Sequence, residues 1–232
     1  MVRYPELKLN YAADDAEKMR DFLLKKEKFN YVFCYTDNSP QENYLPTYAN
    51  IKDVLGLPEE YQEKFIEEGG GDFWFFFSGH GARKDDDQED YLLPRDASKR
   101  DLSGTSVSVT YVRQQLRKPG ADKIVVIIDA CRENSFSQIG EPVQAQIREM
   151  EEIFIYSCRP YEKSRELDKV QQGVFTYKLL EAFRKGYVTP QKLDEYLQLE
   201  VAKLSNQAPI IRYDSTEISN LILTPNSANE DE

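Results

Sequence analysis

One histidine and one cysteine in this chain follow apolar runs that are typical of buried strands. His80 is the only histidine among 232 residues and follows the run Phe73–Phe77, and Cys131 follows the run Ile124–Ile128. A thiolate is a strong nucleophile, and an imidazole can take the proton of a thiol near neutral pH. The two side chains are therefore the minimum set for covalent catalysis by a cysteine with a histidine base, if the fold brings them together.

This chemistry requires the two apolar runs to lie side by side. Both are continuous, rich in aromatic or β-branched residues and too short to span a bilayer, which is typical of strands covered on both faces in a parallel sheet. Residues that follow neighbouring parallel strands meet at one edge of the sheet, where α/β proteins bind their ligands. We therefore expect His80 and Cys131 just beyond the ends of two adjacent strands. A lone histidine also has a purely structural interpretation, and it is the pairing with Cys131 that favours catalysis.

The rest of the chain alternates between helix and strand patterns, which predicts an α/β fold with a mainly parallel central sheet between layers of helices. The predicted helices cover residues 12–26, 47–68 in two pieces, 109–117, 174–185 and 191–204, and the further strands cover residues 31–36, 91–94, 152–158 and 209–214. Polar stretches at 133–150 and 159–172 are predicted loops. We expect one domain over residues 1–222, followed by an acidic tail, 223–232, that is disordered or a linker.

Composition excludes several classes of function. Hydrophobic residues make up 40% of the chain and charged residues 31%, as in soluble globular proteins, and the net charge is −11 without a Lys/Arg stripe. This charge disfavours a nucleic-acid or membrane partner and favours a cationic substrate. The sequence shows no secretion signal or membrane-spanning run, so we expect a cytoplasmic protein. Three cysteines without zinc-type spacing and a single histidine indicate neither a disulfide framework nor a zinc site.

Two short motifs carry a resemblance to a known family. Ser78-Gly79-His80-Gly81 and Asp129-Ala130-Cys131-Arg132 stand about fifty residues apart, in the order histidine then cysteine. With the segments 10–16, 91–96 and 173–177, they resemble the signatures of caspase-like cysteine peptidases, most closely the metacaspase and bacterial orthocaspase branch. The resemblance covers residues 5–215 and implies the three-layer caspase-like fold. The chain departs from the family in having only residues 1–10 where a central strand usually precedes the first helix, and in Arg132-Glu133-Asn134 after the cysteine.

The resemblance implies roles for three residues in catalysis. His80 is the implied general base and acid, and Cys131 is the implied nucleophile that forms a thioester with the substrate. The N–H groups of Gly81 and Cys131 are the implied oxyanion hole, and glycine suits that position because it has no Cβ to crowd the substrate carbonyl.

The resemblance also implies a substrate pocket lined by Asp15, Ser78 and Asp129. Residues two apart in a strand point to the same face, so Ser78 shares the side of His80, and Asp129 shares that of Cys131. Two carboxylates in one pocket repel each other, and an arginine or lysine side chain between them relieves that repulsion. We therefore expect an endopeptidase that cleaves after Arg or Lys. Asp15 at a helix start and Asp129 bonded to a loop backbone are the structural alternatives.

Other functions and partners stay open from the sequence. A catalytically silent caspase-like scaffold module is the main alternative to the peptidase, and an esterase or acyltransferase with the same pair is a third. The expected partner is a protein or peptide with a basic residue, and additional domains or a regulatory protein are further candidates.

These motifs require no cofactor, but two features of the sequence are candidates for regulation. Calcium is one candidate ligand because carboxylates cluster in one stretch, although a solvated loop explains the same run. The residues concerned are Asp85, Asp86, Asp87 and Asp90. The loop 133–150, which contains Arg148, is a candidate site of cleavage by the enzyme itself or by an upstream protease.

Overall fold

Two parallel strands form the centre of the fold. β1 (Gly71–Lys84) pairs with β4 (Ala121–Ala130) from Asp72 opposite Lys123 to Gly79 opposite Ala130. β5 (Glu151–Tyr156) lies parallel to β4 on its other side. β4 is almost entirely buried because helices cover both of its faces, which explains its unbroken β-branched sequence. The two strands predicted to deliver His80 and Cys131 are therefore adjacent and parallel.

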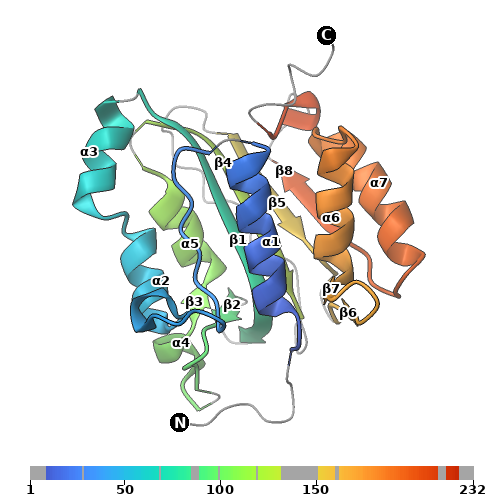
Figure 1. Ribbon diagram of the computed structural model, residues 1–232, viewed down its shortest axis with the longest axis horizontal. Coiled ribbons are helices and arrows are strands. Elements are labelled where there is room, and N and C mark those ends of the chain that lie inside the picture. The colour runs from blue at the N-terminus through green and yellow to red at the C-terminus, as the bar shows by residue number, and fades with distance from the viewer. Residues whose placement is uncertain are drawn as a thin grey trace.

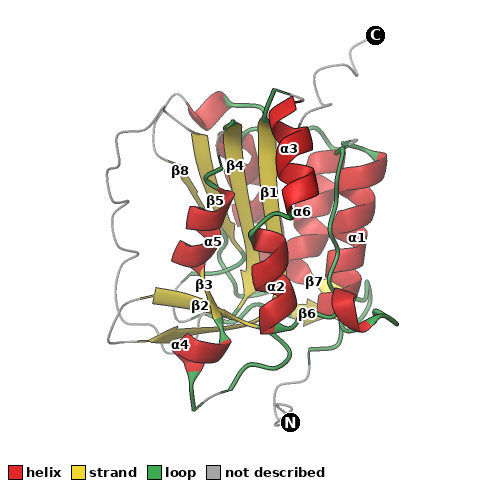
Figure 2. Cartoon of the chain, turned by 90° about the vertical axis from the view of Figure 1, so that its left-hand side faces the viewer, coloured by secondary structure: helices red, strands yellow, loops and turns green. Residues whose placement is uncertain are grey.

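The complete sheet is mixed. The structure is a computed structural model that describes residues 9–27, 29–67, 69–84, 89–98, 100–118, 120–131, 151–159, 162–213 and 218–224. Within these ranges, six strands form one sheet in the order β3-β2-β1-β4-β5-β8 (Figures 1 and 2). The antiparallel members are β2 (Glu89–Leu93), β3 (Val107–Ser108) and β8 (Ile210–Tyr213). A separate hairpin consists of β6 (Glu166–Leu167) and β7 (Gln172–Gly173). The predicted three-layer α/β fold with a mainly parallel centre is confirmed.

Alternate residues of β4 pack into two hydrophobic cores, one under each layer of helices. Val125 and Ile127 belong to the core under α1 (Ala12–Lys25), α6 (Val174–Arg184) and α7 (Pro190–Ala202). Ile124 and Val126 belong to the core under α2 (Tyr48–Leu55) and α5 (Val109–Leu116). The remaining helical elements are α3 (Glu59–Glu67), α4 (Leu102–Thr105) and two 3₁₀ turns, Glu42–Tyr44 and Ile218–Asn220.

Local capping signals in the sequence position these helices as predicted. Thr189 accepts a hydrogen bond from the N–H of Lys192, and Pro190 occupies the first turn of α7. Leu57, with a positive φ of 56°, and Pro58 separate α2 from α3 at the expected interruption.

A buried ion cluster ties α5 to the amino end of β5. Glu152 is 1% exposed, and its carboxylate pairs with the guanidinium groups of Arg113, at 2.6 Å, and Arg117. Two cations around one buried carboxylate compensate its loss of hydration. This cluster lies at the end of the sheet opposite to His80 and Cys131, so it contributes to the scaffold.

Three element predictions were wrong. The segment Tyr31–Thr36 is extended but belongs to no strand, because it forms no strand ladder with any described residue. The run Phe73–Phe77 is half-buried along its whole length, and β4 is its only partner strand among the described residues. The predicted loop 159–172 contains β6 and the start of β7. The loop 133–150 and residues 225–232 of the predicted tail lie outside the described residues.

Candidate active site

The register between β1 and β4 brings His80 and Cys131 to the same edge of the sheet. Ser78 pairs with Asp129 and Gly79 with Ala130, so the histidine and the cysteine each follow the last parallel pair. β1 does not end there as predicted. It continues to Lys84 because β2 becomes its partner, with His80 opposite Leu93. The structure thus confirms the predicted shared edge, while His80 itself lies within a strand.

Gly81 lies directly against the backbone of Cys131. A Cβ atom at position 81 would lie 2.5 Å from the Cys131 carbonyl oxygen and 3.2 Å from the Ala130 Cβ. Any side chain there would force the two strand ends apart, so only glycine fits. The structure therefore brings together the two residues predicted to form the oxyanion hole.

The Cys131 side chain is half-buried. The segment Glu162–Arg165, which we call the crossing segment, lies against it. The Sγ atom of Cys131 lies 3.7 Å from the carbonyl oxygen of Ser164. The hydroxyl of Ser164 donates a hydrogen bond to Asp129. One residue of the crossing segment therefore covers both the thiol and a predicted pocket residue.

The carboxylates of Asp15 and Asp129 flank Gly173. Asp15 accepts hydrogen bonds from the hydroxyl of Ser78 at 3.0 Å and from the N–H of Gly173 at 3.1 Å. Asp129 accepts one from the hydroxyl of Thr176 at 2.7 Å. A Cβ atom at position 173 would lie 2.6 Å from one Asp129 oxygen and 2.9 Å from one Asp15 oxygen, so glycine is required between them. All three predicted pocket residues are brought together here.

Burial and mutual repulsion determine the protonation of this carboxylate pair. Asp15 is 1% exposed and Asp129 is 4% exposed. Burial, followed by the charge of Asp129, raises the pKa of Asp15 to about 8, although the hydrogen bonds from Gly173 and Ser78 act in the opposite direction. Burial also raises the pKa of Asp129, and its hydroxyl donors again oppose the shift. At neutral pH the pair therefore retains a proton, and an entering cation would favour its release.

Gln207 holds the crossing segment in place. Its side-chain nitrogen donates to the carbonyl of Ser157 at 3.0 Å and to the hydroxyl of Ser164 at 3.4 Å, and its oxygen accepts from the N–H of Arg165 at 2.9 Å. Gln207 is 2% exposed, so these bonds are shielded from water. The cover over Asp129 is thus anchored from the chain just before β8.

The β6–β7 hairpin orients α1, and therefore Asp15. The carboxylate of Glu166 accepts hydrogen bonds from the N–H groups of Asn10 and Tyr11, both at 2.8 Å, at the start of the helix. A carboxylate at this position satisfies free N–H groups and complements the helix dipole. Asp14 therefore remains the ordinary first-turn acid, whereas Asp15 points into the interior.

Sequence reasoning missed four residues that contact the carboxylates or their cover. Gly173 and Thr176 stand in a segment quoted for the resemblance, but no role was assigned to them. Ser164 and Gln207 lie in polar stretches without any periodic pattern, so nothing in the sequence distinguishes them. Their roles arise from contacts between segments that are far apart in the chain.

The described residues contain neither a cluster of metal ligands nor a membrane-spanning helix. Within them, no three His, Cys, Asp or Glu side chains gather as metal ligands. Of the four calcium candidates, Asp85, Asp86 and Asp87 lie outside the described ranges, and Asp90 lies in β2. Arg148 and the predicted cleavage loop also lie outside those ranges. In the part of the chain that is described, no helix has the length and apolar character needed to cross a bilayer.

Comparison with known proteins extends over nearly the whole chain. The family model of the caspase domain, peptidase C14, matches residues 1–218. The crystal structure of protein GSU0716 from Geobacter sulfurreducens has a TM-score of 0.63 at 16% identity, over 94% of this chain and 90% of that one. Caspase-1 from Spodoptera frugiperda has a TM-score of 0.55 at 14% identity, over 90% of this chain and 81% of that one. No curated protein matches the chain. At identities this low, the comparison shows that the two structures have the same fold as this chain.

Proposed function

This chain belongs to the caspase domain family, and from that premise we propose that it is a cysteine endopeptidase that cleaves after Arg or Lys through Cys131 and His80. The observation that carries the proposal is the parallel register of β1 with β4, which puts both residues one position beyond the last pair. No helix, loop or ligand needs to move to bring the two strand ends to the same edge.

In the proposed mechanism the thiol and the imidazole exchange one proton. His80 takes the proton of Cys131, and the thiolate attacks the substrate carbonyl to form a tetrahedral oxyanion. N–H groups at Gly81 and Cys131 stabilise that oxyanion, and His80 then protonates the departing amine, which leaves a thioester. Water, deprotonated by His80, hydrolyses the thioester and restores the thiol.

The carboxylate pair supports a preference for a basic residue before the scissile bond. Asp15 and Asp129 together retain a proton because they are buried side by side. A guanidinium or ammonium group between them would replace that proton, and Ser78 would supply one further polar contact. An acidic side chain would add a third negative charge, so substrates with Asp at this position are disfavoured.

Ser164 covers Asp129, and Gly173 lies between both carboxylates, so the proposal requires the crossing segment and the backbone at Gly173 to move before a substrate binds. The described arrangement is then a resting state, in which the Ser164 carbonyl occupies the space next to the Cys131 sulfur. Displacement of Glu162–Arg165 would expose the thiol and Asp129 in one step.

The covered site also favours a second candidate function, a catalytically silent interaction module. The two functions are separated by a peptidyl-arginine chloromethylketone, which alkylates the nucleophile only in a working peptidase site. Stoichiometric labelling at Cys131, blocked in His80→Ala, is expected for the peptidase. Equal slow labelling in both proteins would instead indicate the silent module.

The specificity is tested with matched fluorogenic peptides that end in Arg, Lys or Asp. Wild-type protein is expected to cleave the Arg and Lys peptides, and Asp129→Ala is expected to lose that preference. A preference for the Asp peptide, or an Arg preference unchanged in Asp129→Ala, would show that the pocket is built by other residues.

A further inference from the structure

Ser157 is a buried residue that directly follows β5, and the fold places it beside Asp129 of the carboxylate pair. It is 0% exposed, and its hydroxyl makes no hydrogen bond to a described residue. We propose that Ser157 is a further residue of the substrate pocket and that its hydroxyl accepts a hydrogen bond from the guanidinium group of a substrate arginine. This inference rests on the proposed function, since it concerns the same pocket.

The sheet places Ser157 in a row with two residues already assigned to the pocket. Ser78 on β1 pairs with Asp129 on β4. One residue earlier, Ile128 on β4 pairs with Tyr156 on β5, and the N–H of Ser157 donates to the carbonyl of Ile128 at 2.9 Å. Ser157 is therefore the neighbour of Asp129 on the next strand. Ser78, Asp129 and Ser157 form a row across β1, β4 and the end of β5.

Asp129 and Ser157 face the same layer of helices. Ile127, two residues before Asp129, and Ile155, two residues before Ser157, both belong to the hydrophobic core under α1, α6 and α7. Residues two apart in a strand share a face, so the Ser157 side chain points to the side from which α1 brings Asp15. Burial raises the pKa of Asp129, and Ser157 is among the hydroxyl groups that oppose this rise, as its position beside the carboxylate requires.

Two buried polar side chains next to the carboxylate pair have an atom without a hydrogen-bond partner among the described residues. They are Ser157, beside Asp129, and Gln172, whose amide opposes the rise that burial causes in the pKa of Asp15. A buried polar group without a partner destabilises the free protein. A hydroxyl retained at such a cost beside two carboxylates indicates a partner that arrives with the substrate.

The guanidinium group has the donors that this row of acceptors suits. It carries five N–H groups in one plane and has no acceptor of its own. If two of them bind Asp129, the remaining N–H groups point to the sides, where Ser78 and Ser157 flank that carboxylate. The ammonium group of lysine is a compact charge with three donors, which the two carboxylates can satisfy without Ser157.

Ser157 is fixed to the sheet independently of the cover that must move. Its N–H donates to Ile128, and its carbonyl accepts from the side chain of Gln207 at 3.0 Å. Displacement of the crossing segment would remove the Ser164 hydroxyl from Asp129 and free a carboxylate oxygen next to Ser157. An acceptor that is already in place loses little conformational freedom when the substrate binds.

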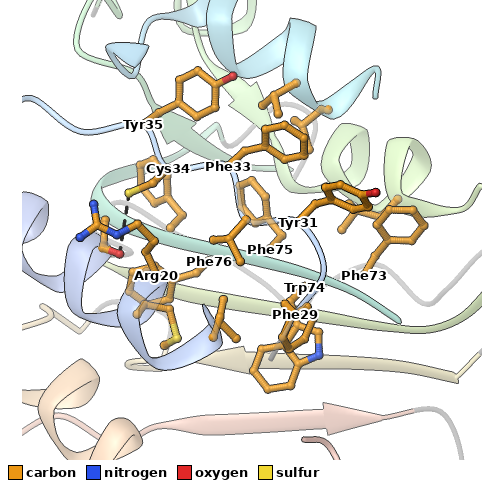
Figure 3. A pocket seen from close by; sticks show the side chains of 18 of the residues that line it. Arg20, Phe29, Tyr31, Phe33, Cys34, Tyr35, Phe73, Trp74, Phe75 and Phe76 are labelled. Carbon is orange, nitrogen blue, oxygen red and sulfur yellow. Dashed lines mark hydrogen bonds between the residues drawn. The ribbon is translucent and has the colours of Figure 1, made fainter. Parts of the chain in front are cut away.

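The largest cavity among the described residues is a separate space. It has a volume of about 680 Å³ and runs along β1, beside mainly apolar and aromatic side chains (Figure 3). Of the row across the sheet, Ser78 lines this cavity, and Asp129 and Ser157 do not. A partner for the Ser157 hydroxyl would therefore enter through the proposed pocket and not from this cavity.

Peptide binding to an inactive protein tests the contact without any need for turnover. The acetylated and amidated peptides Ala-Ala-Ala-Arg and Ala-Ala-Ala-Lys are titrated into Cys131→Ala and into the double variant Cys131→Ala/Ser157→Ala by calorimetry. Loss of the hydroxyl should weaken binding of the Arg peptide about tenfold, because a hydrogen bond to a charged group is lost. Binding of the Lys peptide should weaken less than about twofold.

Ser106→Ala is the matched control. Its hydroxyl is also buried without a partner among the described residues, but it precedes β3 at the far edge of the sheet. Neither Ser157→Ala nor Ser106→Ala should lower the urea midpoint of unfolding, and only the first should weaken binding of the Arg peptide. Thr176→Val removes a hydroxyl that donates to Asp129, so it should lower the midpoint and show that the assay detects a broken bond.

Turnover in proteins that retain Cys131 separates this inference from the proposed function. If wild type cleaves the Arg peptide and Ser157→Ala has the same kcat/KM, the peptidase stands and the role of Ser157 is wrong. If wild type cleaves nothing but the inactive protein binds the Arg peptide in a manner that depends on Ser157, the pocket stands and the peptidase is wrong. Two further results would overturn the inference: no binding of the Arg peptide to Cys131→Ala, or a lower urea midpoint in Ser157→Ala, which would make its hydroxyl structural.

Discussion

Gln207 donates a hydrogen bond to the hydroxyl of Ser164, and the same hydroxyl donates to Asp129. A buried amide in the chain before β8 therefore fixes the cover over one carboxylate and, through the Ser164 carbonyl, over the Cys131 thiol. The cover depends on one side chain that makes three hydrogen bonds.

Removing that amide should open the cover. Gln207→Ala is expected to increase the rate of Cys131 alkylation by iodoacetamide several-fold, at a cost of about 1–3 kcal/mol in the free energy of unfolding. Gln191→Ala, on the exposed first turn of α7, is the control and should change neither quantity. Peptide mapping of the alkylated protein measures the rate at each cysteine. An unchanged rate at Cys131 would mean that Ser164 does not limit access to the thiol.

The two proposed catalytic residues should be dispensable for folding. Cys131→Ala and His80→Ala are each expected to abolish turnover of an Arg peptide while far-UV circular dichroism stays native, because both residues follow the last parallel pair of β1 with β4 and neither belongs to a hydrophobic core. Cys34→Ala is the control: burial raises the pKa of that thiol, and it lies on α1's side of the sheet. Wild-type turnover in either of the first two variants would disprove the assignment.

The carboxylate pair should make stability depend on pH with a defined sign. The pKa of Asp15 is raised to about 8, so between pH 4 and 8 the folded protein retains a proton that the unfolded chain has lost. Stability from this group is therefore present below about pH 4 and is lost as the pH rises toward 8. Asp15→Asn resembles the protonated form and should remove this loss, worth on the order of a few kcal/mol at pH 8 relative to pH 5.

Urea unfolding of wild type and Asp15→Asn across this pH range measures the difference. Asp14→Asn is the control, because the Asp14 carboxylate lies in the same first turn of α1 but does not belong to the pair. Parallel pH profiles of wild type and Asp15→Asn would contradict the assignment of a retained proton to the pair.

The ion cluster at the opposite end of the sheet should be important for stability alone. Replacing both Arg113 and Arg117 by Met leaves Glu152 buried without a cation, which is expected to cost about 3–5 kcal/mol in unfolding free energy. Arg20→Met removes an exposed partner of Asp21 and should cost less than about 1 kcal/mol. Alkylation of Cys131 in the folded double variant should match wild type.

The sequence predicted the features that depend on a local pattern of residues. It missed those that depend on a residue or strand that only the fold brings nearby. Apolar runs ending in His80 and Cys131 located the parallel strands, and the Thr189 cap located α7. The same pattern at Tyr31–Thr36 predicted a strand wrongly, because β propensity does not report whether a partner edge is present. Gly173 could not be identified from sequence either, since its requirement comes from two carboxylates that only the fold brings to either side of it.

β1 carries the aromatic run Phe73–Phe77 toward one end and His80 toward the other. The same length of backbone therefore belongs to the packed sheet and to the proposed site. By linkage, if a ligand that contacts the aromatic run changes substrate affinity at the site by some factor, the substrate changes the affinity for that ligand by the same factor. The ratio of the ligand's affinities with and without an inhibitor bound at Cys131 would give the coupling energy between the two ends of the strand.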